Sequence, residues 1–436
     1  MLKLSFFKIF LVVLLTITSI LSAPTAVHSA PTSVHSAPAL FHSTPASVLA
    51  APTSVSPSTV IGITYTSPLN SPPSSAIEGG SVLLPPPSSS SSIALPPALY
   101  PEAVASTVSR LRFGAVRLVN PHPNLIRAFS FTNASLFLSI PNGLLPPLAS
   151  NRSLAIHWIR THVLAFYPRS KIAVISVGDD VSRLDSELLM TALRKVYSAL
   201  QEVGITRISV TCTFSFLDVV TTAIPPSAAA FKEPIGEALI LPLLRFLEST
   251  NSSFSVSVQP YHMYRVHTQI PLGLALFQGG EHDFYDDFQT GLRYGNLFDM
   301  MADAVFTALA VAGHAKLPLI VAESGWPASG ADSDANLAYA AAYVRSLVAH
   351  LSSGGATPMG KLATQAYLFE LTDGTEGENL WGLLFTNLSR KYAFHVPEPI
   401  SGSGSGRQSV SIQVLPAPAD SIPVVRMIAV TILVGF

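Results

Sequence analysis

The stretch Lys171-Ile-Ala-Val-Ile-Ser-Val-Gly-Asp-Asp-Val181 carries the pattern from which the fold is predicted. Its apolar first part, ended by a glycine and two acids, is typical of a buried strand. The residues from Asp185 to Val203 follow with apolar side chains at spacings of three and four, which is typical of an amphipathic helix. A strand and a helix in succession predict one unit of a parallel α/β sheet.

The same alternation continues in both directions from this stretch. Further apolar runs of strand type lie at Val60–Tyr65, Ala115–Val119, Ser135–Ile140, Arg207–Cys212, Phe254–Val258, Leu317–Ala322 and Leu362–Tyr367. Helical spacing recurs at Ser153–Phe166, Leu297–Ala312 and Asn336–Ser352. About eight strands alternating with helices predict a closed (β/α)8 TIM barrel. An open doubly wound sheet is the structural alternative, although no glycine fingerprint follows the first strand.

Composition limits the classes of partner. The chain has 436 residues, of which 48% are hydrophobic and 12% charged, and its formal net charge is −1. This balance excludes a basic nucleic-acid surface and favours a neutral partner. Cys212 is the one cysteine, so no internal disulfide framework can form. We expect a monomer stabilised by a large core.

The N-terminal residues have the composition of a targeting segment and a spacer. Residues 1–23 combine a short basic start with an apolar run and small residues, which predicts a signal peptide, with a signal anchor as the alternative. Residues 24–59 contain a seven-residue Ser-Ala-Pro repeat that cannot form a packed core, so we expect a disordered spacer. Repeat duplication explains its histidines, His28, His35 and His42, more simply than metal binding.

The barrel is expected to occupy residues 60–396, with a Pro/Ser-rich surface loop at 72–97. Residues 397–436 hold a Ser/Gly linker and a hydrophobic tail. This tail fits a GPI lipid-anchor signal, a membrane-associated tail or a disordered tail. Four acceptor sequons, at Asn133, Asn151, Asn251 and Asn387, agree with secretion to the cell wall or the outer face of the plasma membrane.

Two groups of acids follow apolar runs. Asp179 and Asp180 come after the fourth predicted strand, and Glu323 comes after the seventh. Because the C-terminal ends of parallel barrel strands meet at one mouth, we expect these carboxylates to face one another there. Cleavage of a glycosidic bond requires such a pair, one group protonating the leaving oxygen and the other attacking the anomeric carbon. Helix N-capping is the alternative function for Asp179 and Asp180.

Several motifs resemble one known family. Val321-Ala-Glu-Ser-Gly-Trp-Pro327 is similar to the nucleophile signature of plant glycoside hydrolase family 17, the endo-β-1,3-glucanases, which reads Val-Ser-Glu-Ser-Gly-Trp-Pro. The resemblance extends from about Ile61 to about Phe394, through the segments Ile61–Tyr65, Val116–Pro121, Ser139–Asn142, Val177–Val181 and Glu378–Leu383.

This resemblance implies that Glu323 is the nucleophile of a retaining hydrolase of β-glucan. It also implies that Tyr65, Trp326 and Glu378 line the sugar cleft, with Asp179 and Tyr261 at further substrate positions. Aromatic rings suit the apolar edges of a pyranose, although Trp381 is equally explained as a buried core residue. The reaction needs only carboxylates and water, so neither a metal nor a cofactor is implied.

The chain departs from the family at the acid/base position. The family carries Val-Gly-Asn-Glu-Val where this chain has Asp179 and Asp180. Asp180 keeps the acid but shortens its reach by about 1.5 Å, whereas a retaining pair should lie about 5 to 5.5 Å apart. A misplacement of that size can cost about a hundredfold in rate. Two adjacent acids should also raise one pKa.

Other positions differ as well. Gln259-Pro-Tyr261 replaces Tyr-Pro-Tyr, and the lysine usual after the eighth strand is missing between Thr372 and Gly377. Two hypotheses therefore stand: a β-1,3-glucanase with Asp180 as a compromised acid/base, and a glucan-binding surface protein with slow turnover or none. A structural spacer is the least favoured alternative, because it leaves the Glu323 segment unexplained.

Overall fold

The computed structural model describes residues 58–67, 100–280, 283–374 and 379–397. All of them belong to one compact unit, Val55–Phe436. The predicted signal peptide at 1–23 and the Pro/Ser loop at 72–97 lie outside the described residues. The predicted spacer and tail also lie outside them, except for residues 58, 59 and 397 at their edges.

Parallel strands form one sheet that closes on itself. Its order is β5-β4-β3-β2-β1-β11-β10-β7-β6, and each neighbouring pair in it is parallel. The two outer strands, β5 and β6, flank Cys212 in the sequence, so both edges of the sheet belong to one stretch of chain. The predicted (β/α)8 barrel is therefore confirmed and the open sheet excluded. The strand bounds are β1 (Val60–Thr66), β2 (Ala115–Val119), β3 (Ser135–Ile140), β4 (Lys171–Val177), β5 (Ser209–Thr211), β6 (Thr213–Ser215), β7 (Phe254–Ser257), β10 (Leu319–Ser324) and β11 (Ala363–Leu368).

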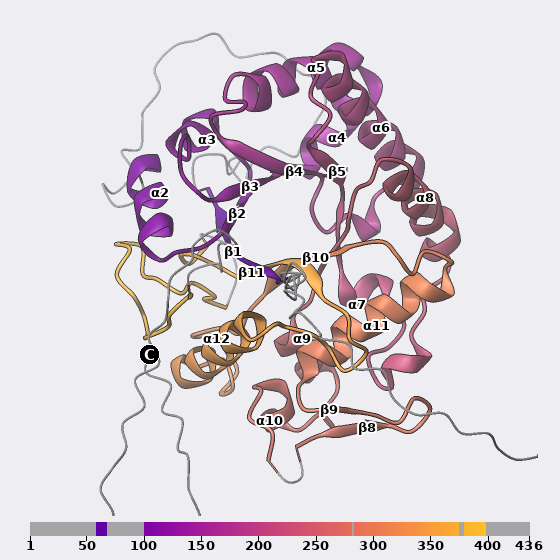
Figure 1. Ribbon diagram of the computed structural model, residues 1–436, viewed down its shortest axis with the longest axis vertical. Helices are drawn as coiled ribbons and strands as arrows, with labels where there is room; N and C mark the ends of the chain where they lie inside the picture. The colour runs from indigo at the N-terminus through magenta and orange to yellow at the C-terminus, as the bar shows by residue number, and fades with distance from the viewer. Residues whose placement is uncertain (1–57, 68–99, 281–282, 375–378, 398–436) are drawn as a thin grey trace, which may run out of the picture. The chain divides into compact units, whose positions relative to one another are not determined.

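Helices surround the strands (Figure 1). They are α2 (Pro101–Arg110), α3 (Pro123–Ala128), α4 (Leu145–Ser150), α5 (Arg152–Ile159), α6 (Ser186–Glu202), α7 (Phe216–Val219), α8 (Leu241–Ser249), α9 (Pro260–Val266), α10 (Leu272–Ala275), α11 (Leu297–Val311) and α12 (Leu337–Ser352). Short 3₁₀ turns lie at Asn142–Leu144, Val181–Arg183 and Pro226–Ala228, and π turns at Arg160–Leu164 and Gly236–Ile240. An antiparallel hairpin, β8 (Tyr285–Asp287) and β9 (Leu292–Tyr294), follows α10.

Polar side chains define where the long helices begin. The Asp185 carboxylate accepts the Leu188 N–H at 2.8 Å, and the Asn336 side chain accepts the Tyr339 N–H at 3.0 Å. Each bond satisfies a backbone donor that the first helical turn leaves unpaired. Asp180 makes no such side-chain bond to the turn that follows it. Helix capping, the alternative considered for Asp179 and Asp180, is thus performed by Asp185.

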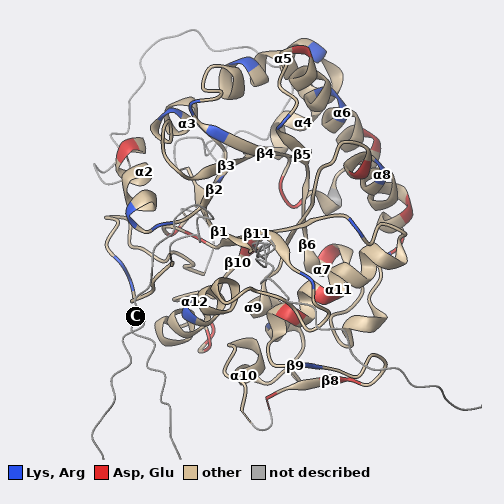
Figure 2. Cartoon of the chain, in the orientation of Figure 1, with Lys and Arg blue, Asp and Glu red and all other residues tan. Residues whose placement is uncertain are grey.

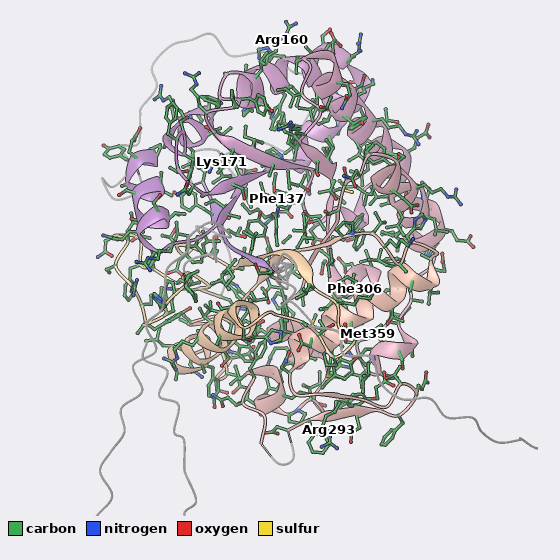
Figure 3. The ribbon with its side chains drawn as sticks, in the orientation of Figure 1. Phe137, Arg160, Lys171, Arg293, Phe306 and Met359 are labelled. Atoms are coloured by element: carbon green, nitrogen blue, oxygen red, sulfur yellow. The ribbon has the colours of Figure 1, made fainter. Side chains whose placement is uncertain are left out.

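The interior of the barrel is filled by side chains. A small cluster of Ala115, Phe137, Val174, Ile320 and Tyr367 is buried there, one residue from each of five strands. The Phe137 and Tyr367 rings meet edge to face, with centroids 5.6 Å apart. Figure 3 places Phe137 within the ring of strands and Arg160 on the outer helical layer. The larger apolar cluster fills the space between strands and helices.

Charged residues lie mostly on the outer elements. Figure 2 shows basic and acidic segments interspersed over the helices and the β8–β9 hairpin. This distribution agrees with the near-zero net charge and with the absence of a strong single-sign field. Within the described ranges, no helix combines the length and apolarity needed to cross a bilayer.

Candidate active site

The predicted acids lie at the same end of the barrel. Glu323 is the second-last residue of β10. Asp179 and Asp180 come just after the end of β4. Both strands belong to one parallel sheet, so their carboxyl ends share one mouth. The pairing of β10 with β7 shifts between Val321 and Glu323, and such bulges re-aim side chains at strand ends.

Glu323 is a largely buried carboxylate, with 16% of its side chain exposed. Its Oε1 accepts a hydrogen bond from Arg117 Nη1 at 2.5 Å, and its Oε2 accepts one from Gln259 Nε2 at 3.4 Å. Burial raises the pKa of Glu323, and the Arg117 guanidinium opposes that rise by stabilising the ionised form. The glutamine that replaces the first tyrosine of the family's Tyr-Pro-Tyr therefore contacts the predicted nucleophile.

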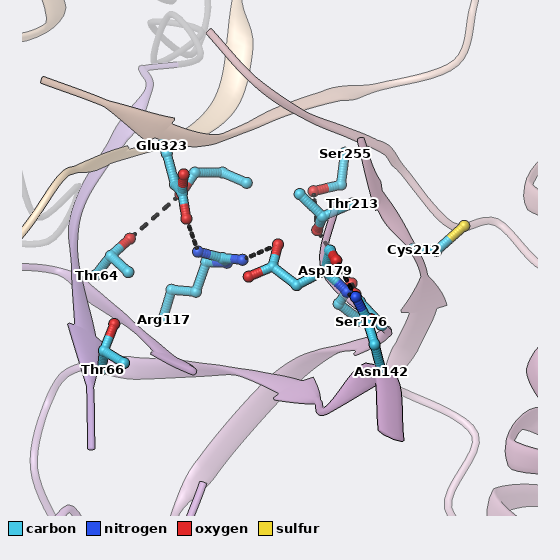
Figure 4. Close-up of polar contacts among 12 residues, drawn as sticks. Thr64, Thr66, Arg117, Asn142, Ser176, Asp179, Cys212, Thr213, Ser255 and Glu323 are labelled. Atoms are coloured by element: carbon cyan, nitrogen blue, oxygen red, sulfur yellow. Dashed lines mark hydrogen bonds and ion pairs between the residues drawn. The ribbon is translucent and has the colours of Figure 1, made fainter. Parts of the chain in front are cut away.

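Arg117 joins two of the predicted acids (Figure 4). The arginine is fully buried in β2, and its Nη2 lies 2.5 Å from Asp179 Oδ1 while Nη1 binds Glu323. Sequence reasoning did not name Arg117 as a site residue. The signal was present, because a lone arginine inside the apolar run Ala115–Val119 requires a buried carboxylate partner.

The loop that carries Asp179 is held by its backbone. Asn142 accepts the Asp179 N–H at 2.9 Å and donates to the Asp179 carbonyl at 2.7 Å. Gly178 has a φ of 87°, and a Cβ there would lie 2.4 Å from Val181 Cγ1. Only glycine fits this position without displacing a neighbour. Asn142 comes from the third strand motif of the family resemblance.

Asp180 faces different neighbours from Asp179. Its backbone is left-handed, with a φ of 47°, and its Oδ1 accepts a hydrogen bond from Ser182 Oγ at 3.3 Å. Ser182 Oγ also lies 2.8 Å from Asp218 Oδ2, so one hydroxyl links the two acids. Burial raises the pKa of Asp180, and the negative charge of Asp218 adds more to that rise than Asp179 does. The sequence anticipated the influence of Asp179 but missed Asp218.

A third carboxyl group lies at the mouth and was also missed. Glu370, just past β11, is 5% exposed and accepts hydrogen bonds from Thr66 Oγ1 at 3.2 Å and from the Gly374 N–H at 3.1 Å. Burial and the charge of Glu323 raise its pKa to about 7. The same carboxyl contributes, after burial, to a rise in the pKa of Tyr65.

The predicted aromatic positions are buried. Trp326 has no exposed surface, and Tyr65 and Tyr261 expose only 2% each. The Trp326 indole donates to the Asp334 carbonyl at 2.8 Å, and its ring packs against Tyr261 with centroids 5.1 Å apart. The three rings are therefore buried in this structure, and the exposed stacking face expected at these positions is not seen.

The remaining predicted positions have different outcomes. Glu378 lies outside the described residues. Trp381 is 9% exposed and packs edge to face on Tyr261, which agrees with the core function considered for it. No lysine lies between Thr372 and Gly377, but Lys391 reaches this segment from later in the chain, with its Nζ 2.6 Å from Asp373 Oδ1.

Comparisons with known proteins agree with this geometry. Residues 101–396 match the family described as glycosyl hydrolases family 17. The chain is 32% identical to a probable glucan endo-1,3-β-glucosidase A6 of Arabidopsis thaliana over 333 residues, 72% of this chain and 67% of that protein. It is 32% identical to a glucan endo-1,3-β-glucosidase GV of Hordeum vulgare, covering 65% of this chain and 90% of the relative.

A solved structure extends the similarity to the fold. A β-1,3-glucanase and pollen allergen of Cryptomeria japonica aligns with a TM-score of 0.65 and 29% identity, over 69% of this chain and 95% of that one. The matches span 62% and 57% of the lengths of two further Arabidopsis thaliana glucan endo-1,3-β-glucosidases, numbers 2 and 12. The matched family region contains β2 to β11 and the acids at the barrel mouth. This chain belongs to glycosyl hydrolases family 17.

Proposed function

We propose that the protein hydrolyses β-1,3-glucan of the cell wall by a retaining mechanism, with Glu323 as the nucleophile. The observation that carries this proposal is the position of Glu323 at the C-terminal end of β10, held by Arg117 inside the signature Val321–Pro327. The activity is proposed for this chain from its family and its site, since the chain spans only part of several relatives.

The proposed reaction assigns two steps to two carboxyl groups. Glu323 attacks the anomeric carbon while Asp180 gives a proton to the leaving oxygen, so a glycosyl-enzyme forms and the glycosidic bond breaks. Asp180 then takes a proton from water, which attacks the same carbon and releases Glu323. Burial supports the first step, because a raised pKa keeps a larger fraction of Asp180 protonated near neutral pH.

The direct test is hydrolysis of laminarin-type oligosaccharides by the purified full chain. We expect new reducing ends from the wild type and none above background from Glu323→Gln, which keeps the shape and removes the nucleophile. Proton NMR of the first product should show the β-anomer before mutarotation. Oligosaccharides that remain intact with the wild type, or an α-anomer as the first product, would contradict the proposal.

A second candidate is a glucan-binding protein with little turnover. The observation that favours it is the environment of Asp180, whose short side chain is bonded to Ser182 and lies beside Asp218. Under this proposal, laminarin oligosaccharides bind measurably by calorimetry while their length distribution stays unchanged. Binding and cleavage in the same preparation separate the two candidates.

Substrate contacts are proposed for the positions that the resemblance implies. Tyr65, Asp179, Tyr261, Trp326 and Glu378 would bind or shape the site for a glucan chain, and alanine substitutions should raise KM. For the buried rings of Tyr65, Tyr261 and Trp326 this requires local movement, so their effect is expected to be partly structural.

Location and assembly are also proposals. We propose a secreted monomer, glycosylated and held at the cell wall or the outer face of the plasma membrane by a lipid anchor. The four sequon asparagines, Asn133, Asn151, Asn251 and Asn387, are all exposed, which supports glycosylation. Release by a phosphatidylinositol-specific phospholipase, a mass shift after deglycosylation and light scattering test these points separately.

A further inference from the structure

The buried guanidinium of Arg117 has two carboxylate partners. Nη1 lies 2.5 Å from Glu323 Oε1 and Nη2 lies 2.5 Å from Asp179 Oδ1, while the arginine side chain has no exposed surface. The cluster therefore carries one positive and two negative formal charges. One carboxylate is enough to neutralise the charge of a guanidinium. The second carboxylate therefore adds an uncompensated negative charge at the mouth.

Asp179 acts on Glu323 both directly, by repulsion between the two negative charges, and through the arginine that they share. Arg117 stabilises the ionised form of Glu323, whereas the negative charge of Asp179 disfavours it. The guanidinium is rigid and planar, so a single orientation of the group determines the directions of both terminal nitrogens. Each carboxylate consequently helps to fix the guanidinium orientation that the other carboxylate binds.

The backbone fixes Asp179 in this arrangement. Asn142 binds both the N–H and the carbonyl of Asp179, and Gly178 supplies the left-handed turn that precedes it. Because the main chain is held at both polar groups, the side chain points into the barrel mouth toward Arg117 (Figure 4). Its neighbour Asp180 is directed instead to Ser182 and Asp218.

We propose that Asp179 is a positioning residue, which holds Arg117 and thereby controls the charge and orientation of Glu323. Its Oδ1 is occupied by the guanidinium, while 28% of the side chain remains exposed at the mouth. The consequence for turnover rests on the proposed hydrolase function; the effect on Glu323 does not.

Other groups also face Glu323. Gln259 Nε2 donates to it, Ser257 of β7 contributes a hydrogen bond, and Glu370 beyond β11 adds a like charge. Among the described residues, however, Arg117 has ion pairs with Asp179 and Glu323 alone. Removal of the Asp179 charge therefore acts on Glu323 in two ways, by relieving a direct repulsion and by freeing the shared guanidinium.

The test is Asp179→Asn, which keeps the shape and removes the charge. Carboxyl ¹³C NMR of the full chain labelled at glutamate measures the pKa of Glu323, whose signal is identified by its absence in Glu323→Gln. We expect a downward shift of the Glu323 pKa in Asp179→Asn, and the same direction in Asp179→Ala. Asp180→Asn is the matched control: it removes the same charge one residue away and should shift the Glu323 pKa less.

An unchanged Glu323 pKa in a folded Asp179→Asn variant would overturn the proposal, as would an equal shift in Asp180→Asn. Thermal unfolding shows that the variant is folded. Loss of folding in Asp179→Asn would also overturn it, because Arg117 and Glu323 alone form a neutral pair that should be tolerated.

Turnover supplies an independent measurement. If Asp179 positions Arg117, Asp179→Asn should change kcat and move the acidic limb of kcat/KM to lower pH, because a more acidic nucleophile stays ionised further down the pH scale. A rise confined to KM would identify Asp179 as a substrate ligand and overturn the proposal. If Asp179→Asn shifts the Glu323 pKa as expected but the wild type cleaves nothing, this inference stands and the hydrolase proposal is rejected.

Discussion

At the residue scale, the proposed acid/base Asp180 gives the first prediction. Its carboxyl is protonated more readily than an ordinary aspartic acid because of burial and Asp218, but it ends one methylene short of a glutamate. We predict that Asp180→Glu increases hydrolysis of laminarin oligosaccharides, by up to about a hundredfold if reach is the main defect. Initial rates of reducing-end formation measure the effect.

The matched control for this variant is Asp218→Glu. It adds the same methylene to the acid on the other side of Ser182, and we expect no increase from it. If Asp180→Glu leaves the rate unchanged, the reach of Asp180 does not limit hydrolysis, and the substitutions at Asp179 and Gln259 are the next positions to test.

Glu370 gives a prediction about pH and stability. Burial and Glu323 raise its pKa in the folded state from the ordinary 4.5 to about 7. The folded state therefore binds the Glu370 proton more tightly than the unfolded state does. This proton binding stabilises the fold fully below pH 4.5, and the stabilisation is lost as the pH rises toward 7. We therefore predict that Glu370→Gln increases stability relative to the wild type at pH 8 and not at pH 4, by about 1.4 kcal/mol for each unit of the pKa rise.

Urea unfolding at pH 4 and at pH 8 measures this difference. Glu187→Gln is the control, because Glu187 is exposed on the first turn of α6 and should show no change across the same window. A Glu370→Gln variant that loses stability equally at both pH values would show that hydrogen bonding to Thr66 and Gly374 outweighs the charge.

Residue patterns predicted the acids of the site but not their partners. Glu323, Asp179 and Asp180 were found because each follows an apolar run, which is a local signal. Arg117 was overlooked although it lies in a quoted motif, since the sequence does not say which acid meets it across the barrel. Asp218 and Glu370 were missed because they lie on connections after strands whose positions depend on closure of the whole sheet.

At the scale of elements, the loop after β10 is tied to α9. Tyr261 Oη donates to Asp332 Oδ2 at 3.0 Å, and Tyr264 Oη donates to Asp334 Oδ2 at 2.9 Å. Arg265 adds an ion pair of 2.5 Å to Asp332. These bonds hold together the connections that follow two adjacent strands, β7 and β10, and Trp326 packs beneath them.

We predict that Tyr261→Phe loosens this connection while keeping the ring packing. One hydrogen bond to a charged group contributes about 1.5 to 3 kcal/mol at most, so the protein should remain folded. Hydrogen exchange at 329–336 should increase, and kcat/KM should fall. Tyr392→Phe is the control, because the buried Tyr392 hydroxyl has no hydrogen-bond partner among the described residues. Its removal should leave hydrogen exchange at 329–336 unchanged. Unchanged exchange in Tyr261→Phe would contradict the prediction.

Elements were predicted best where their patterns are strongest. The strands β2, β3 and β4 have the bounds that their apolar runs predicted, because parallel strands buried on both faces read as continuous apolar stretches. The predicted helix Ser153–Phe166 instead begins at Arg152 and ends in a π turn, Arg160–Leu164. The β8–β9 hairpin was missed, since its short polar strands have neither an apolar run nor a clear alternation.

At the scale of the whole molecule, closure of the barrel follows from a feature that the sequence shows only indirectly. Alternation predicted eight strands in a ring, but not that the ring closes across Cys212: the predicted strand Arg207–Cys212 contains β5, and the short β6 that follows it was not predicted. A closed sheet has an interior of limited volume, and that volume must be filled by inward-facing side chains. Phe137 and Tyr367 are the large rings of that interior cluster.

The interior packing also supports the site. The Arg117 guanidinium lies 5.6 Å from the centroid of the Phe137 ring, so the ring borders the cation that joins Asp179 to Glu323. We predict that Phe137→Ala costs about 3 to 5 kcal/mol of stability, because the transfer free energy of the ring is lost and a void remains. Activity of the folded fraction should fall as well, since Arg117 loses a packed neighbour.

Phe131→Ala is the matched control for this prediction. The same ring is removed from a position that is 84% exposed, where we expect a change within about 0.5 kcal/mol and unaltered hydrolysis. Urea unfolding followed by fluorescence gives the stabilities, and rates are compared at a temperature where both variants are folded. If Phe137→Ala is as stable as Phe131→Ala, the interior cluster does not stabilise the closed barrel. If Phe137→Ala is destabilised but keeps full activity, Arg117 is held by its two carboxylates alone, and the barrel interior and the site are energetically separate.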